Sequence, residues 1–186
     1  MNQLLWFGTR ATALTSIVLL TLTVVLGALT AGRGAPLGLP PFVRTSLHRR
    51  LALVMVCFVA LHVITAISET YVDIGWASLL VPFTAGYRPF WVGLGTFAFD
   101  LLAAIMISSL LRERMPQRSW RVVHWLTYAL WPIALLHGFG TSSSDGTLVT
   151  AITIGCAGAG LAAVGWRAST GRSVARRQLA DAQSWS

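Results

Sequence analysis

The chain has 186 residues, the size of one domain, and 55% of them are hydrophobic while only 11% are charged. Soluble domains carry about 25% charged residues, so this composition excludes a soluble globular domain and a disordered chain. All 14 basic residues are arginines, against 6 acidic residues, but they gather at the ends of apolar stretches, which is typical of membrane orientation and not of nucleic-acid binding.

Five apolar stretches are each about 20 residues long, the length that an α-helix needs to cross a membrane. We therefore predict an all-α membrane protein whose five transmembrane helices lie at residues 11–31, 46–68, 91–111, 119–139 and 148–166. The first stretch is long for a signal peptide and its stronger basic flank follows it, so we expect an uncleaved anchor. We predict one transmembrane domain over residues 1–168 and a polar, frayed cytoplasmic tail over 169–186.

Several features between and inside these stretches carry local predictions. Ser46 and Ser119 stand where helix N-caps are expected, just before apolar periodicity begins. The connection over residues 69–90 contains an apolar run too short to span. It either lies along the outer interface, folds back as a cap, or is an ordinary interfacial loop with aromatic anchors. Cys57 and Cys156 lie inside apolar stretches, where we expect small buried side chains and no disulfide framework.

The placement of arginine predicts the orientation of the spans. The first and third connections and the C-terminal flank are rich in arginine, whereas the second and fourth connections are not. The positive-inside rule then places the rich segments on the cytoplasmic side of the membrane and the N-terminus outside, and only Arg10, just before the first span, argues mildly against this orientation. The arginines that carry this prediction are Arg33, Arg44, Arg49, Arg50, Arg112, Arg114, Arg118, Arg121, Arg167, Arg172, Arg176 and Arg177.

The four histidines divide into two pairs. His48 and His62 lie 14 residues apart on the second predicted span, and His124 and His137 lie 13 apart on the fourth. With a rise of 1.5 Å per residue, either spacing is roughly 20 Å along a helix. Because these two spans run in the same direction, His48 can face His124 at the inner level and His62 can face His137 at the outer level.

Two imidazoles that approach from opposite sides are what axial ligation of a six-coordinate haem iron requires. A lone histidine inside a membrane is often only a helix–helix hydrogen bond, but four at matched depth on two parallel helices favour two haems in a four-helix core. Zinc fits less well, because two histidines at each level without nearby Cys, Asp or Glu make a poor tetrahedral site.

One detail conflicts with regular helix geometry. Fourteen residues return to within about 40° of the same helix face, but thirteen residues miss it by about 140°. Pro132 lies between His124 and His137 and can kink or rewind this span.

These residues resemble the ferric-reductase-like transmembrane domain family, which includes the membrane part of NADPH oxidases. The likeness is greatest to small members of actinobacterial type, which implies a bacterial plasma membrane. The family's specific signature is a pair of histidines 14 residues apart on one helix and a pair 13 residues apart on the next helix but one. The likeness covers nearly the whole chain and includes the segments Ile17-Val-Leu-Leu, Val81-Pro-Phe-Thr-Ala-Gly-Tyr-Arg-Pro, Ser108-Ser-Leu-Leu-Arg, Trp120-Arg-Val-Val-His-Trp and Leu136-His-Gly-Phe-Gly-Thr.

The resemblance implies a cytochrome b-like oxidoreductase subunit in which two haems b, with iron held by the pairs His48–His124 and His62–His137, carry electrons across the membrane. Larger relatives carry a cytosolic domain for FAD and NADPH, but no Gly-x-Gly-x-x-Gly fingerprint occurs here. We therefore expect the redox partner to be a separate flavoprotein, carrying FMN or FAD, or a quinol. The family's oxidases carry a further histidine one turn past the outer ligand, where this chain has Ala66.

Haem propionates are anions that commonly meet arginine, so Arg44 and Arg121 are candidate contacts at the inner level, although the positive-inside rule explains them equally well. Arg88, beside Tyr87, lacks that explanation and is the better candidate at the outer level. Asp100, near the middle of the third span, either relays protons or bonds a Ser, Thr or Trp across the bundle, and we favour the bond. Three aromatic residues beside the histidines of the fourth span are expected to pack or mark interfaces: Trp125, Tyr128 and Trp131.

No catalytic residue is predicted, and several alternatives stay open. A ferric or metal-chelate reductase and an oxygen-reducing oxidase use the same haem core. A non-redox membrane scaffold, or a metal or proton transporter that uses the histidines and Asp100, does not. The direction of electron flow and the oligomeric state are left open by the sequence.

Overall fold

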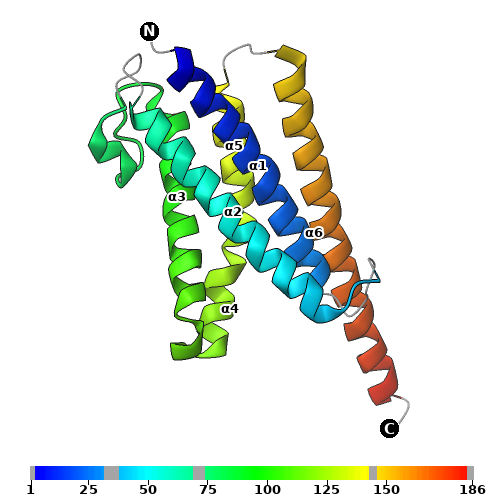
Figure 1. The fold of residues 1–186 in the computed structure, drawn as a ribbon. Helices are drawn as coiled ribbons and strands as arrows, with labels where there is room; N and C mark the ends of the chain where they lie inside the picture. The colour runs from blue at the N-terminus through cyan, green and yellow to red at the C-terminus, as the bar shows by residue number, and fades with distance from the viewer. Residues whose placement is uncertain (1–2, 32–37, 69–73, 143–145, 184–186) are drawn as a thin grey trace.

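The structure is a computed structural model that describes residues 3–31, 38–68, 74–142 and 146–183, with side chains described as far as residue 170. Its described part is helical (Figure 1) and consists of α1 (Gln3–Ala31), α2 (Pro41–Ser68), η1 (Trp76–Leu79), α3 (Pro89–Leu110), η2 (Arg112–Arg114), α4 (Gln117–Trp125), α5 (Thr127–Thr141) and α6 (Gly146–Gln183). Five segments are long and apolar enough to cross a membrane: Gln3–Thr30, Pro41–Ser68, Pro89–Leu110, Gln117–Thr141 and Thr147–Thr170. The predicted all-α fold with five spans is confirmed.

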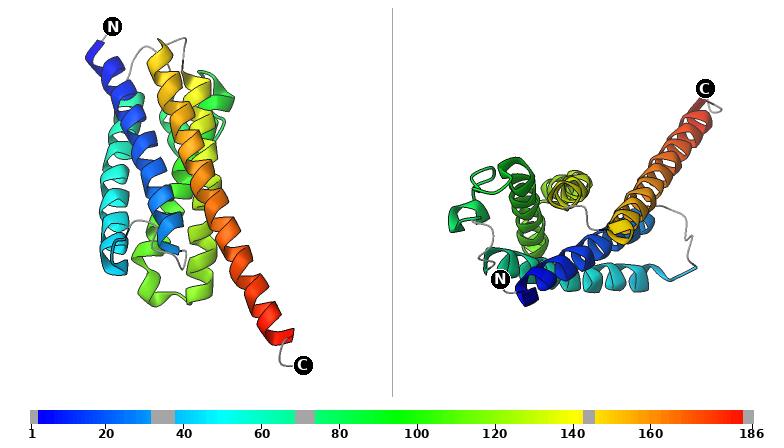
Figure 2. Two further views of the ribbon diagram at one scale, coloured as in Figure 1. Left: turned by 90° about the vertical axis from the view of Figure 1, so that its right-hand side faces the viewer. Right: turned by 90° about the horizontal axis from the view of Figure 1, so that it is seen from above.

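The helix boundaries differ from the predicted ones. Ser46 lies inside α2, which begins at Pro41, because the fixed φ of proline and its missing N–H suit the first helical turn. Pro116 takes the N-cap position of α4 and makes no side-chain cap bond, so both serine caps were wrong predictions. The tail predicted to fray is also different, since α6 continues as a helix to Gln183 and extends past the other helices (Figures 1 and 2).

Helix α1 organises the bundle. It packs along α2 and α6 and touches α5, whereas α3 packs along α5 and α4 (Figure 2). In the described part of the chain, α2 packs closely along α1 and does not pack closely against α4 or α5. The second and fourth spans therefore lie across from one another without a close helix–helix interface.

Trp131 of α5 anchors the middle of the bundle. Its indole Nε1–H donates to the Thr21 hydroxyl of α1 at 3.1 Å, and its ring lies so close to Gly160 of α6 that a Cβ there would overlap it. The ring is only 4% exposed, which confirms its predicted packing role. The core around it draws on α1, α2, α3 and α5: Leu20, Val24, Met55, Ala98, Leu102, Ile105 and Leu130.

The fourth span is interrupted at Leu126, and Pro132 lies within the unbroken α5. The Leu126 N–H bonds the Val123 carbonyl and the Ala129 N–H bonds the Leu126 carbonyl, both i to i+3 bonds that wind the chain more tightly than an α-helix. The Thr127 hydroxyl donates to the His124 carbonyl at 2.7 Å and so partners a carbonyl beside the break. The rewinding expected near Pro132 thus lies at Leu126, closer to His124.

The connection between α2 and α3 folds back onto α3. The Thr96 hydroxyl donates to the Ser78 carbonyl at 2.6 Å in a buried position, and Gly93 leaves room for Phe83, whose backbone N would lie 2.6 Å from a Cβ at Gly93. Phe83 has a backbone φ of 69°, a conformation that residues other than glycine rarely adopt. Of the placements left open by the sequence, these contacts favour the folded-back one.

Candidate functional site

The structure brings the four histidines together in two pairs. The ring centres of His48 on α2 and His124 on α4, the first pair, are 6.2 Å apart with their planes at 70°. Those of His62 on α2 and His137 on α5, the second pair, are 6.3 Å apart with their planes at 68°. These are the partners that depth along the spans predicted.

The separation within each pair has a direct chemical meaning. Two imidazoles that bind one metal ion from opposite sides, each through a nitrogen about 2.0 Å from the metal and about 1.1 Å from its own ring centre, have ring centres about 6.2 Å apart. No hydrogen bond joins the two rings of either pair among the described residues. The spacing within each pair therefore matches that of two imidazoles bound to one metal ion.

Backbone carbonyls of neighbouring helices fix three of the four rings. His48 Nδ1 lies 3.1 Å from the Thr23 carbonyl oxygen of α1, and His62 Nδ1 lies 3.2 Å from that of Thr9, also on α1. His137 Nδ1 lies 2.8 Å from the Trp91 carbonyl oxygen of α3.

A carbonyl oxygen only accepts hydrogen bonds, so in each of these three contacts the Nδ1–H is the donor. In the neutral imidazole the lone pair then resides on Nε2, which is the state that metal ligation needs. The three bonds thus do more than join helices, because they also select the tautomer of each ring.

Two glycines leave space for the imidazoles. A Cβ at Gly95 of α3 would lie 2.5 Å from His137 Cε1, and a Cβ at Gly27 of α1 would lie 3.2 Å from His48 Cε1. A side chain at Gly95 would displace the His137 ring, whereas the contact between a side chain at Gly27 and the His48 ring would be less tight. Neither glycine was predicted from the sequence, because only the packing of α1 and α3 reveals their neighbours.

The donor set favours haem over a protein-only metal site. Within the part of the chain that the structure describes, no group of three or more His, Cys, Asp or Glu residues could hold a metal ion. A site with two imidazoles per metal leaves four positions of an octahedral ion for another ligand, which is what a porphyrin supplies. The residues present therefore fit the haem that the sequence predicted.

Arg88 joins the second connection to the end of α5. It takes a left-handed conformation with φ 40° at the N-cap of α3, and its Nη1 donates to the Gly140 carbonyl at 2.8 Å. Its guanidinium carbon lies 5.6 Å from the Tyr87 ring centre. Because Gly140 follows His137 by three residues, Arg88 is held at the end of the bundle that carries the second pair.

The two arginines predicted near the first pair are placed differently from each other. Arg44 is 7% exposed and its Nη1 donates to the Leu29 carbonyl at 3.2 Å, which ties the start of α2 to the end of α1. Arg121 is exposed on α4. Of the arginines that predict orientation, Arg33 lies outside the described residues, and so do the side chains of Arg172, Arg176 and Arg177.

Asp100 is half-buried near the middle of α3. Among the described residues it makes no hydrogen bond or ion pair, so the cross-bundle bond that we favoured is absent. Cys57 is also unlike its prediction, because it is exposed on α2, whereas Cys156 is buried as expected; neither forms a disulfide.

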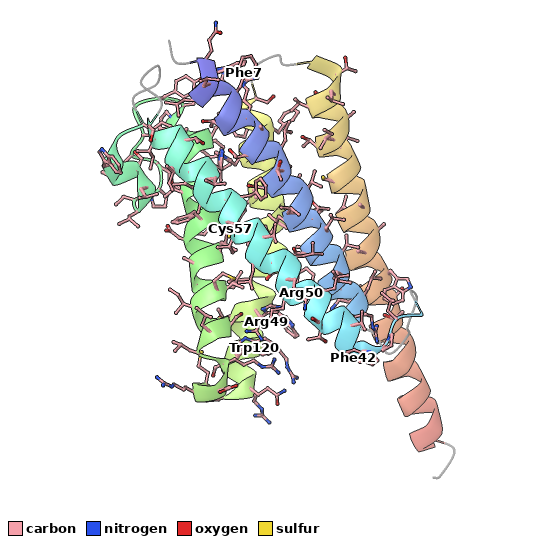
Figure 3. The ribbon with its side chains drawn as sticks, in the orientation of Figure 1. Phe7, Phe42, Arg49, Arg50, Cys57 and Trp120 are labelled. Carbon is pink, nitrogen blue, oxygen red and sulfur yellow. The ribbon has the colours of Figure 1, made fainter. Side chains whose placement is uncertain are left out.

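Trp120 is a site residue that the sequence analysis did not single out. Its ring stacks on the His124 imidazole, with ring centres 5.0 Å apart and planes at 23°. Arg112 lies over the Trp120 ring, with its guanidinium carbon 4.4 Å from the ring centre. Figure 3 labels Trp120 on α4, and Arg49 and Arg50 on α2, at the end of the bundle that carries the first pair. The signal was present in the sequence, because residues four apart share a helix face.

Comparison with known protein families identified a match over most of the chain. Residues 8–135 match the family described as ferric reductase like transmembrane component, a range that covers most of the chain and three of the four histidines. No curated protein and no solved structure showed a significant match.

Proposed function

Given that the chain belongs to the family of ferric reductase-like transmembrane components, we propose that it carries electrons across the membrane through two haems b. His48 and His124 hold one haem, and His62 and His137 hold the other. The observation that carries this proposal is the repeated pair geometry, with ring centres 6.2 and 6.3 Å apart at two depths of the bundle. When bound, haem b supplies reversible one-electron chemistry at its iron.

The chain's own residues prepare these positions. The carbonyls of Thr23, Thr9 and Trp91 hold three imidazoles with their Nε2 lone pairs free. A hydrogen bond from Nδ1 to a carbonyl fixes the ring and raises the basicity of the ligand. The loose approach of α2 to α4 and α5 supports a planar group between these helices.

The depth of the two pairs supports transfer across the membrane. His48 and His62 are 14 residues apart on the unbroken α2, which is roughly 21 Å along its axis at 1.5 Å per residue. The hydrocarbon core of a bilayer is about 30 Å thick, so one pair lies towards each side. Electrons that enter at either pair leave at the other.

Orientation and partners belong to the same proposal. Arginine gathers at the start of α2 and around the turn between α3 and α4, which favours a cytoplasmic first pair and an outer second pair: Arg44, Arg49, Arg50, Arg112, Arg114, Arg118 and Arg121. We infer that Arg88, with Tyr87, contacts a propionate of the outer haem, and that Arg44 and Arg121 are the corresponding candidates at the inner haem. A separate flavoprotein or a quinol would exchange electrons with this chain.

Vesicles test this function directly. The full chain is loaded with haem and reconstituted into liposomes that contain ferricyanide, and dithionite is added outside as a membrane-impermeant reductant. We expect the trapped ferricyanide to be reduced by the wild type and not by His48→Ala or His62→Ala, each of which interrupts the route. Cys57→Ala, an exposed change on the same helix, is the matched control and should keep the wild-type rate. Equal rates for all four proteins would overturn the proposal.

A further inference from the structure

His124 differs from the other three histidines in what surrounds its Nδ1. The Nδ1 atoms of His48, His62 and His137 each contact a backbone carbonyl, at 3.1, 3.2 and 2.8 Å. His124 Nδ1 is buried and has no hydrogen-bond partner among the described residues. The torsion that turns an imidazole about its Cβ–Cγ bond has broad minima, so a ring without such a bond needs another restraint.

Trp120 supplies a restraint of a different kind. It precedes His124 by one helical turn on α4, and its ring lies nearly parallel to the imidazole, at 23° and 5.0 Å between centres. No other histidine of the four has a tryptophan stacked on it among the described residues. Stacking restricts the tilt of a ring but donates no hydrogen bond and accepts none, so it gives His124 Nδ1 no hydrogen-bond partner.

Arg112 completes the arrangement from outside α4. Its guanidinium carbon lies 4.4 Å from the Trp120 ring centre, the geometry of a cation–π contact. Arg112 lies on η2, so this contact joins the turn between α3 and α4 to the ring that holds His124. A positive charge is thereby fixed beside the first pair.

We propose that Trp120, held by Arg112, is the positioning residue for His124: its stacked ring sets the imidazole plane in place of the Nδ1–H bond that orients the other three ligands. This inference rests on the proposed function, because it concerns haem ligation by the first pair. Trp120 acts on the haem through His124, and Arg112 acts by holding Trp120 and through its charge; neither residue need touch the haem.

Two consequences follow for the first-pair haem. The angle between the two imidazole planes that would hold this haem depends on Trp120, whereas at the second pair it depends on backbone carbonyls. The His124 ring also lacks the bond that raises ligand basicity, and a cation lies beside it; both effects favour the reduced iron and so raise the midpoint potential of this haem. Loss of the Arg112 charge should therefore lower that potential.

Electron paramagnetic resonance of the oxidised full chain in detergent measures the first consequence. The g values of a low-spin ferric haem depend on the angle between its two imidazole planes, and His62→Ala protein, which retains the first pair alone, assigns the signals. We expect Trp120→Ala to shift the first-pair signal and leave the second-pair signal in place. Trp120→Phe, which keeps a stacked ring, should restore it. Trp125→Ala, an exposed change beside His124, is the matched control.

A redox titration measures the second consequence. Arg112→Gln should lower the midpoint potential of the first-pair haem only, whereas Arg114→Gln on the same short helix should change neither haem. Loss of the first-pair haem from Trp120→Ala, with the second haem retained and Trp120→Phe normal, would equally support positioning. If a protein with two haems keeps an unchanged first-pair signal and potential in Trp120→Ala and Arg112→Gln, the inference is overturned and the proposed function stands. A wild-type chain that takes up no haem overturns both.

Discussion

His62 on α2 and His137 on α5 face one another with ring centres 6.3 Å apart, and each ring is fixed by a carbonyl from a different neighbouring helix, Thr9 on α1 and Trp91 on α3. Four helices thus contribute to one pair. This arrangement explains why the imidazoles can be held apart across a loosely packed interface, since each is restrained from behind by its own neighbour.

Single ligand substitutions should separate the two haems. His62→Ala or His137→Ala removes one axial ligand of the second pair, and we expect haem content to fall from two to one per chain. His48→Ala or His124→Ala should remove the other haem instead. A pyridine haemochrome assay with a redox difference spectrum measures the loss. Simultaneous loss of both haems from a folded single variant would contradict the pairing.

Filling the space beside His137 tests whether close packing at Gly95 positions this ring. Gly95→Ala puts a Cβ where 2.5 Å separates it from His137 Cε1, which is far inside van der Waals contact. We expect this variant to lose the second-pair haem, while Gly27→Ala, at 3.2 Å from His48 Cε1, weakens the first-pair haem less. Gly158→Ala, with open space around the added carbon, is the control and should behave as wild type in haem content.

The register between the two histidines of the fourth span should tolerate no insertion. One alanine inserted after Ile133 rotates His137 by about 100° relative to His124, so the second-pair haem should be lost and the first retained. An alanine inserted after Ser142, beyond the end of α5, leaves the register intact and serves as control. Retention of both haems by the first insertion would show that α5 does not set the position of His137.

The contact between Trp131 and Thr21 should matter for stability and not for haem. Trp131→Phe removes a buried hydrogen bond of 3.1 Å between α5 and α1, which we expect to cost about 1 kcal/mol. Thermal unfolding in detergent, followed by circular dichroism, measures the decrease, and the haem spectrum should not move. Trp125→Phe, at an exposed ring, should leave the melting temperature unchanged. A spectral change in Trp131→Phe would assign this ring to the haem sites instead.

Arg88 links the second connection to the site. Arg88→Gln removes its charge and its bond to the Gly140 carbonyl, so we expect the midpoint potential of the second-pair haem to fall and that of the first-pair haem to stay. Redox titration of both haems measures this. Arg10→Gln, which changes an arginine on α1 that stacks on Trp6, is the comparison and should have a smaller effect. The opposite order of the two effects would count against Arg88 as a propionate contact.

The sequence predicted the spans and the histidine pairs because both follow from simple periodicities. Length and apolar composition identify a membrane helix, and the rise per residue gives the depth of each histidine on it. The break at Leu126 was not predictable in the same way. Proline is the visible signal for helix distortion, whereas Leu126 is marked only by i to i+3 bonds that form in the folded chain.

The hydrogen-bond acceptors and the glycine neighbours of the histidines could not be predicted from the sequence. Any residue carries a carbonyl, so nothing in the identities of Thr9, Thr23 or Trp91 distinguishes them as acceptors. Gly27 and Gly95 are two of 17 glycines, and only the packing of α1 and α3 shows which ones face an imidazole. The stacking of Trp120 on His124 was the exception, because their spacing of four residues is visible on any helix.

The most direct test of the central claim is the haem content and redox spectrum of the purified wild-type chain. We predict two haems per chain, both low-spin in the oxidised and the reduced state, and both lost when His48 and His62 are replaced together by alanine. A purified, folded chain without a Soret band, or a double variant that keeps both haems, would contradict the account.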